Sequence, residues 1–192
     1  FIVYKNTFWP FQDSQPLVKN VRIKKGERVL DIGTGSGVIA VFACYKGAGR
    51  VVAVDINPWA VKSARENAKR HCLDQIMEVR QGDVFSCIKK ERFDVITANL
   101  PFRDKPAPNL VARSQWDTNY KTNKTFLRQA ARYLKENGRI YLSHANFGSV
   151  RALKELAYSA GFSMRNIAQA RKRPNGEEIF YAFLLKRKKK PV

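Results

Sequence analysis

The sequence predicts an α/β fold in which helices cover both faces of a mostly parallel sheet. Short, continuously apolar runs alternate along the chain with longer stretches of helical length. A continuous apolar run is typical of a strand that is buried on both faces, and strands that alternate with helices indicate parallel pairing. A length of 192 residues predicts one domain, or one domain with a short appendage, with room for a core. Ligands of such sheets bind beyond the carboxyl ends of the strands, so the residues that follow each strand are the candidates for function.

The predicted elements follow in chain order. Five short runs are expected to be strands: 28–32, 51–55, 76–80, 93–98 and 139–143. The first two are apolar enough to be buried. The stretches with helical length and apolar content are 17–21, 38–46, 58–70, 124–135 and 149–159. Asn57 is the expected N-cap of the third helix, with Pro58 in its first turn. The pair Asn137-Gly138 is expected to end the fourth helix.

Two segments read as loops. Residues 103–109 are rich in proline and charge, and residues 171–176 contain Pro174-Asn175-Gly176. The second loop joins apolar runs at 167–170 and 179–186, which predicts a closing hairpin.

The chain is strongly basic. It carries 36 Lys and Arg against 16 Asp and Glu, a net charge of +20, and five of the cations form the run 186–190. Such a balance favours a polyanionic partner, nucleic acid above all, and RNA in particular; the open alternative is a generic solubility surface. We expect no membrane contact, because no apolar run approaches ~20 residues and no amphipathic helix has an exposed aromatic face. Residues 1–11 lack the charged start and apolar middle of a signal peptide.

The cysteines and histidines point to no metal. Cys44, Cys72 and Cys87 stand apart from one another, and neither His71 nor His144 lies at a ligand spacing from a partner. We expect free thiols in a reducing compartment, which corresponds to a cytoplasmic protein.

A glycine-rich turn follows the first strand. Asp31, Gly33, Thr34, Gly35 and Gly37 belong to the run Asp-Ile-Gly-Thr-Gly-Ser-Gly, whose alternate glycines let the backbone turn tightly and approach a ligand. The spacing is GxGxG and differs from the GxGxxG of nicotinamide and flavin enzymes. The alternative is an ordinary glycine turn between a strand and a helix.

Acidic residues follow the second and third strands. Asp55 lies 22 residues after Gly33, where a carboxylate can accept hydrogen bonds from both hydroxyls of a ribose. Asp83 could accept a hydrogen bond from an adenine amino group; the alternative is a helix N-cap.

Together these motifs resemble the class I S-adenosylmethionine-dependent methyltransferases over residues 10–185. The resemblance implies a Rossmann-like, seven-stranded sheet in the order 3-2-1-4-5-7-6, with strand 7 antiparallel. It implies S-adenosylmethionine as cofactor, with the 33–37 loop around its methionine part. It further implies Asp55 on the ribose, Ile56 beside the adenine and Asp83 on the adenine amino group.

The tetrapeptide Asn99-Leu100-Pro101-Phe102 follows the fourth strand. A planar amide or amine nitrogen is a poor nucleophile, so a catalyst has to hold it in line and help its lone pair localise. The Asn99 side-chain carbonyl and the Leu100 backbone carbonyl can each accept one N–H, Pro101 stiffens the turn, and Phe102 can stack on a planar substrate. The alternative is an ordinary turn with Phe102 in the core.

Two local resemblances refine this prediction. The tetrapeptide resembles the Asn-Pro-Pro-Tyr/Phe motif of methyltransferases that act on nucleobase amines or protein glutamine, with Leu100 in place of the first proline. The run Pro10-Phe11-Gln12-Asp13-Ser14 resembles the segment that precedes the cofactor loop in the release-factor glutamine and small-domain methyltransferases. By that resemblance Asp13 and Ser14 lie over the cofactor; the alternative is a helix cap.

These predictions divide the chain into a segment over the cofactor site (1–25), a methyltransferase domain (26–186) and a basic tail (187–192). The favoured substrate hypothesis is an exocyclic amine of a nucleobase in RNA, either adenine N6 or guanine N2. The aromatic residues expected to flank the site and stack on a base are Trp9, Phe11, Phe102, Trp116 and Tyr120. The alternatives are glutamine in a release factor or ribosomal protein, and a small molecule.

Overall fold

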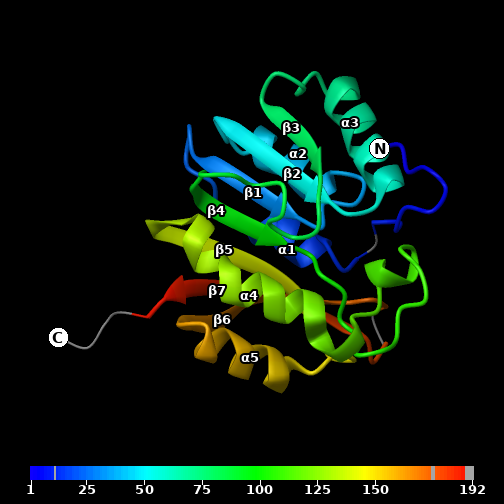
Figure 1. The fold of residues 1–192 in the computed structure, drawn as a ribbon, viewed down its shortest axis with the longest axis vertical. Coiled ribbons are helices and arrows are strands. Elements are labelled where there is room, and N and C mark those ends of the chain that lie inside the picture. Colours follow the sequence, from blue (N-terminus) through cyan, green and yellow to red (C-terminus); the bar gives the residue numbers. More distant parts are fainter. Residues whose placement is uncertain (11, 174–175, 189–192) are drawn as a thin grey trace.

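The computed structural model describes residues 1–10, 12–173 and 176–188, and Figure 1 shows its arrangement. The helices are α1 Gln15–Asn20, α2 Val38–Tyr45, α3 Pro58–Arg70, α4 Lys121–Tyr133 and α5 Val150–Ser159, with 3-10 turns η1 Ala112–Ser114 and η2 Thr118–Tyr120. The strands are β1 Arg28–Ile32, β2 Arg50–Asp55, β3 Met77–Gln81, β4 Phe93–Ala98, β5 Leu134–Ala145, β6 Phe162–Arg171 and β7 Ile179–Arg187.

The seven strands form one sheet in the order β3-β2-β1-β4-β5-β7-β6. The five strands β1 to β5 pair in parallel, while β7 runs antiparallel to both β5 and β6. The expected fold class, strand order and closing hairpin are therefore confirmed.

Helices cover both faces of the sheet, and α4 and α5 lie on the near face in Figure 1. Alternate side chains of each central strand enter opposite cores, so Leu30 and Ile96 pack under α4 and α5, while Val29 and Val95 pack under α1 to α3. All four are fully buried. This two-sided burial explains why these strands are mostly apolar.

Local capping explains the boundaries of α3. The Asn57 side chain accepts a hydrogen bond from Trp59 N at 3.0 Å, and Pro58 occupies the first turn. This helix and β4 have the bounds that the sequence predicts.

Two predicted boundaries around β5 are wrong. Helix α4 ends at Tyr133 and Asn137-Gly138 does not terminate it, because the buried Leu134 pairs with Phe93 and draws the chain into the sheet. Pairing then resumes at Val95 and Arg139, so residues 135–138 form an irregular excursion of the strand. The expected strand 139–143 is thus the centre of a longer one.

The two ends of the chain pack on the domain. The buried Asn67 side chain of α3 bonds the backbone of Ile2 in both directions, at 2.7 Å each. At the other end Arg187, the first residue of the expected basic tail, still belongs to β7, and its side chain donates to the carbonyls of Ala131 and Leu134. Residues 189–192 of that tail lie outside the described part of the chain.

Candidate functional site

A cavity of about 830 Å³ lies where the carboxyl ends of the parallel strands meet. This is within the range of small-molecule sites and at the edge of the sheet where such folds bind ligands. Its walls come from the N-terminal segment, the turns after β1, β2, β3 and β4, the loop that follows Phe102, and the β6–β7 hairpin.

The glycine-rich turn forms the floor beside β2. The backbone N–H groups of Gly33 and Thr34 both donate to Val54 O, at 2.9 and 3.0 Å. Gly33 has φ +71°, and a Cβ there would lie 3.3 Å from the Asn99 carbonyl oxygen, so this turn holds two candidate segments in contact. Gly37 does not line the cavity; a Cβ would press on Ala64, and its role in the structure is close packing against α3.

Asp31 also lies outside the cavity wall, although the sequence predicts a cofactor contact there. It is fully buried, and its Oδ1 accepts a 2.6 Å hydrogen bond from the Thr97 hydroxyl. Its Oδ2 has no hydrogen-bond partner among the described residues. Burial raises the pKa of Asp31 to about 6, against the opposing effect of the Thr97 hydroxyl.

Asp55 and Ile56 line the cavity at the end of β2. The Asp55 carboxylate accepts from Gly35 N at 2.8 Å through Oδ2 and from Asn57 N at 2.9 Å through Oδ1. Burial raises its pKa, while these backbone donors act in the opposite direction. The carboxylate is thus oriented by backbone bonds before any ligand arrives.

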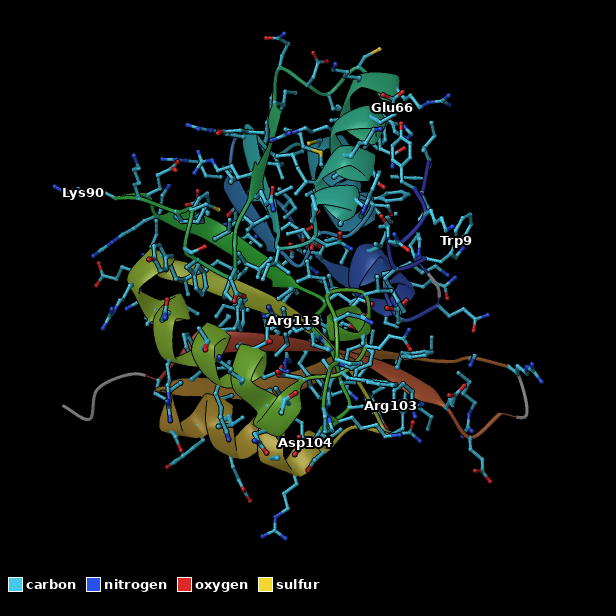
Figure 2. The ribbon with its side chains drawn as sticks, turned by 45° about the vertical axis from the view of Figure 1, so that its right-hand side comes forward. Trp9, Glu66, Lys90, Arg103, Asp104 and Arg113 are labelled. Atoms are coloured by element: carbon cyan, nitrogen blue, oxygen red, sulfur yellow. The ribbon has the colours of Figure 1, made fainter. Side chains whose placement is uncertain are left out.

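Asp83 faces a partner that the sequence gives no sign of. Its carboxylate pairs with Arg113 Nη2, at 3.2 and 3.4 Å, across the mouth of the cavity. Arg113 belongs to η1 in the loop after β4, which folds back so that Arg103 and Trp116 form an isolated bridge. In Figure 2 Arg103 and Arg113 both lie at this end of the sheet, whereas Lys90 lies at the opposite end.

Asn99 and Asp13 are brought together at the centre of the site. Asn99 Nδ2 donates to Asp13 Oδ2 at 2.8 Å, and the Ser143 hydroxyl donates to the Asp13 carbonyl at 2.9 Å. The bond from Asn99 to Asp13 fixes the orientation of the Asn99 side-chain amide and leaves Oδ1 as the acceptor of that amide. Oδ1 is buried and has no hydrogen-bond partner among the described residues. Ser14 also lines the cavity, at the start of α1, and its side chain makes no cap hydrogen bond there.

The three residues after Asn99 differ in their surroundings. The Leu100 carbonyl accepts no hydrogen bond from another described residue, whereas the Pro101 carbonyl accepts one from Asn123 Nδ2 at 3.0 Å. Phe102 reaches the cavity but is only 9% exposed. Its ring packs within 5.4–6.3 Å, centroid to centroid, of His144, Phe147 and Phe180. Phe102 is therefore part of a small aromatic core. Its ring is packed on other side chains and is not exposed for stacking on a substrate, contrary to what the sequence suggested.

Most of the aromatic residues expected around the site lie elsewhere. Trp9, Trp116 and Tyr120 do not line the cavity, and Phe11 lies outside the described residues. Phe8, Phe147 and Phe180 line it instead. The sequence offers no signal for Phe147 and Phe180, because strand pairing beside β5 brings them to Phe102.

The rim near the hairpin is basic. Arg103, Lys172 and Arg173 line it together with one carboxylate, Glu178, which pairs with both Arg103 and Lys172. Asp13 lies at the centre with Asn99, Asp55 lies beside the glycine turn, and Asp83 is paired with Arg113. The cavity is thus acidic at the glycine turn and basic at the hairpin.

Two classes of feature are missing from the part of the chain that the structure describes. No three His, Cys, Asp or Glu side chains gather as a metal site within it. None of its helices has the length and apolar character to span a membrane.

Comparison with known proteins gives consistent relatives. The chain is 32% identical to a release factor glutamine methyltransferase of Shewanella oneidensis over 89% of its length, and 32% identical to a ribosomal protein L11 methyltransferase of Bacillus subtilis over 76%. It spans only 63% and 40% of those two proteins. Its fold matches the crystal structure of a ribosomal protein L11 methylase from Lactobacillus delbrueckii subsp. bulgaricus, with a TM-score of 0.69, 22% identity, and coverage of 95% of this chain and 82% of that one.

A family model matches most of the chain. Residues 12–169 match the methyltransferase small domain, which includes every strand from β1 to β5 and the whole glycine turn. The chain therefore belongs to the methyltransferase small domain family of S-adenosylmethionine-dependent enzymes.

Proposed function

We propose that this chain transfers a methyl group from S-adenosylmethionine to a planar nitrogen that carries N–H groups. One observation carries the proposal: Asn99 Oδ1 is a buried acceptor without a described partner, held in one orientation by Asp13 and placed next to the glycine turn. A buried acceptor that lacks a donor costs about 1–3 kcal/mol, which a substrate N–H would recover.

The residues of the acidic end fit the cofactor. S-adenosylmethionine supplies an electrophilic methyl group on a positively charged sulfonium. Asp13 and Asp55 give that part of the cavity the complementary charge, and the buried Thr34 side chain lines it beside the glycine turn. In this proposal Gly33 and Gly35 leave room for the methionine part, Asp55 holds the ribose, Ile56 packs on the adenine and Asp83 accepts its amino group. Asp31 is buried beneath the glycine turn, outside the cavity wall, and does not touch the cofactor directly in this proposal.

The chain's own residues then position the nitrogen. Asn99 Oδ1 accepts one N–H and the Leu100 carbonyl accepts a second, which fixes the lone pair along the line of transfer. Pro101 and Phe102 hold the backbone of this turn. Oδ1 has almost no contact with solvent in this structure, so a neighbouring side chain has to move before a substrate reaches it.

The N-terminal segment completes the pocket in this account. Phe8, Pro10, Asp13 and Ser14 line the cavity from one side, so residues 1–25 act as a cover over the cofactor site of the 26–186 domain. The bond from Asn99 to Asp13 links the cover to the catalytic turn.

The first candidate substrate is an exocyclic amine of a nucleobase in RNA. The basic rim of Arg103, Lys172 and Arg173 and the net charge of +20 support it, because phosphates would lie around a target base. The second candidate is protein glutamine, and the similarity to a release factor glutamine methyltransferase over 89% of this chain supports it. An amide and a base amine present the same planar N–H groups to Asn99.

Transfer of labelled methyl groups tests the proposal and separates the two candidates. The protein is incubated with tritiated S-adenosylmethionine and a ribosome-containing lysate, and the labelled product is digested with nuclease or with protease. Nuclease release is expected, and protease release would assign the protein substrate instead. Asn99→Ala should abolish the incorporation. Absence of label in any macromolecule, or equal incorporation by Asn99→Ala, would contradict the proposed reaction.

A further inference from the structure

A second cavity of about 740 Å³ lies beside the first. Its lining joins the loop after β4 to the first two turns of α4, and includes Trp116, Lys121, Thr122, Lys124, Thr125 and Arg128. Asp83, Arg113 and Thr122 line both cavities, so the Asp83–Arg113 ion pair stands between them. A molecule that occupies the second cavity lies directly beside the site of the proposed reaction.

The free charge in this cavity is positive. Lys121, Lys124 and Arg128 recur at helical spacing on one face of α4, and none of them makes an ion pair with a described residue. Their opposite face carries Phe126 and Leu127 into the core.

Both carboxylates in the lining are already engaged. Asp83 pairs with Arg113. Asp117 is buried and accepts hydrogen bonds from Thr122 N at 2.8 Å, from Asn123 N at 3.0 Å and from Asn123 Nδ2 at 2.8 Å. Neither is free to neutralise the three cations of α4, so these cations remain available to an anionic ligand.

The lining also offers groups that complement a nucleotide. The hydroxyls of Thr122 and Thr125 lie on the same stretch of α4 as the cations. Trp116 is half-buried at the wall, and Lys105 Nζ lies 5.8 Å from its ring centroid. Cations and hydroxyls bind phosphate oxygens, while an indole face stacks on a base.

We propose that this second cavity binds the phosphate backbone of a single-stranded RNA, at nucleotides next to the one whose base enters the first cavity. The inference rests on the proposed nucleobase activity and names where its substrate is held. A nucleic acid matches the cavity better than an acidic protein segment, because it presents a phosphate at every residue and bases that can use Trp116.

Salt-dependent binding of a defined probe tests this inference. The probe is a fluorescein-labelled oligouridylate of 15 nucleotides, and its dissociation constant is measured by anisotropy between 50 and 200 mM NaCl. The variant Lys121→Gln/Lys124→Gln/Arg128→Gln removes three charges from the cavity. The matched variant Lys69→Gln/Lys89→Gln/Lys90→Gln removes three exposed charges from the other end of the sheet, where Lys90 lies in Figure 2.

The cavity variant should bind the probe at least tenfold more weakly at 100 mM NaCl. Its plot of log affinity against log salt should flatten by about 2, since each single-strand contact contributes about 0.7. The matched variant should keep the wild-type slope. Trp116→Ala should weaken binding about 5- to 150-fold and should also leave the slope of log affinity against log salt unchanged. Melting temperature and S-adenosylmethionine affinity should be unchanged in both triple variants.

Three results would overturn the inference: equal flattening in the two triple variants, an unchanged slope in the cavity variant, or displacement of the probe by an oligoglutamate of equal charge as readily as by unlabelled RNA. Each leaves the proposed reaction intact if nuclease still releases the methyl label. Conversely, the expected flattening of the slope in the cavity variant, together with label released by protease, would contradict the nucleobase assignment. The second cavity would then remain an RNA-binding site without a target base in the first cavity.

Discussion

Asn99 donates a hydrogen bond from Nδ2 to Oδ2 of Asp13 over 2.8 Å, although the two residues are 86 positions apart in the chain. Asp13 is anchored in turn by the Ser143 hydroxyl at the end of β5. Because the bond uses the amide's nitrogen, its oxygen is left as the acceptor for a substrate. The orientation of the proposed catalytic group therefore depends on a segment outside the sheet.

Asp13 should consequently act as a positioning residue. Asp13→Ala frees the Asn99 amide to rotate, and turnover should fall roughly tenfold or more. Asp13→Asn retains an oxygen that can accept the same bond, so it should restore most of the rate. Single-turnover kinetics on both variants check this. Equal losses in the two variants would indicate that the carboxylate charge matters more than the orientation.

Asp55→Ala should weaken cofactor binding. The loss of a carboxylate that accepts ribose hydroxyls costs about 1–3 kcal/mol, or about 5- to 150-fold in affinity. Titration calorimetry with S-adenosylmethionine and its demethylated product measures this change. Asp74→Ala, at an exposed position before β3, is the matched control and should bind normally. Normal affinity in Asp55→Ala would remove Asp55 from the cofactor site.

Phe102→Ala should act mainly on stability. The ring is 9% exposed and packs among Phe147, Phe180 and His144, so its removal should lower the free energy of unfolding by about 3–5 kcal/mol. Phe102→Tyr keeps the ring and should retain most of the turnover. Urea unfolding and single-turnover rates are compared on the same samples. A stable Phe102→Ala protein with a much lower rate would instead support direct stacking on the substrate.

Two buried groups should make stability depend on pH in opposite directions. Burial lowers the pKa of His144 to about 4, below its ordinary 6.5, so the unfolded chain alone takes up this proton between pH 6.5 and 4. The contribution of His144 to the free energy of unfolding therefore decreases as the pH falls from 6.5 to 4, by about 3 kcal/mol in all. Asp31, with a pKa raised to about 6, is stabilising below its ordinary 3.8 and loses that contribution as the pH rises through 6.

Replacing His144 should expose the Asp31 effect. In His144→Gln the free energy of unfolding should decrease between pH 4 and pH 6, whereas the two effects offset each other in the wild type. Urea unfolding at a series of pH values, with His71→Gln as the control for the other histidine, measures the difference. Parallel curves for wild type and His144→Gln would show that His144 does not titrate as described.

The sequence predicts those parts of the fold whose causes are local. The bounds of α3 follow from Asn57 and Pro58, and β4 is a mostly apolar run between the polar residues Arg92 and Asn99. Helix α4 begins three residues before the predicted start, because Asp117 in the preceding polar loop accepts hydrogen bonds from Thr122 N and Asn123 N of its first turn. The end of α4 depends on Leu134 pairing with Phe93, which only the assembled sheet reveals.

The candidate site divides in the same way. Residues that follow strands, such as Asp55 and Asn99, could be predicted because parallel strands present their carboxyl ends at one edge. Arg113 could not, since its contact with Asp83 arises from a loop that folds back over 30 residues of chain. The aromatic neighbours of Phe102 likewise depend on how β7 pairs with β5.

The central claim is that Asn99 acts on the nitrogen and leaves the cofactor to other residues. Single-turnover methyl transfer and S-adenosylmethionine affinity, measured on the same Asn99→Ala preparation, test it most directly. The account predicts a rate lowered about 10²-fold or more with nearly unchanged cofactor affinity and melting temperature, and partial activity in Asn99→Asp, whose carboxylate still accepts an N–H. A folded Asn99→Ala protein with the wild-type rate would contradict the claim, and with it the assignment of a planar nitrogen as substrate.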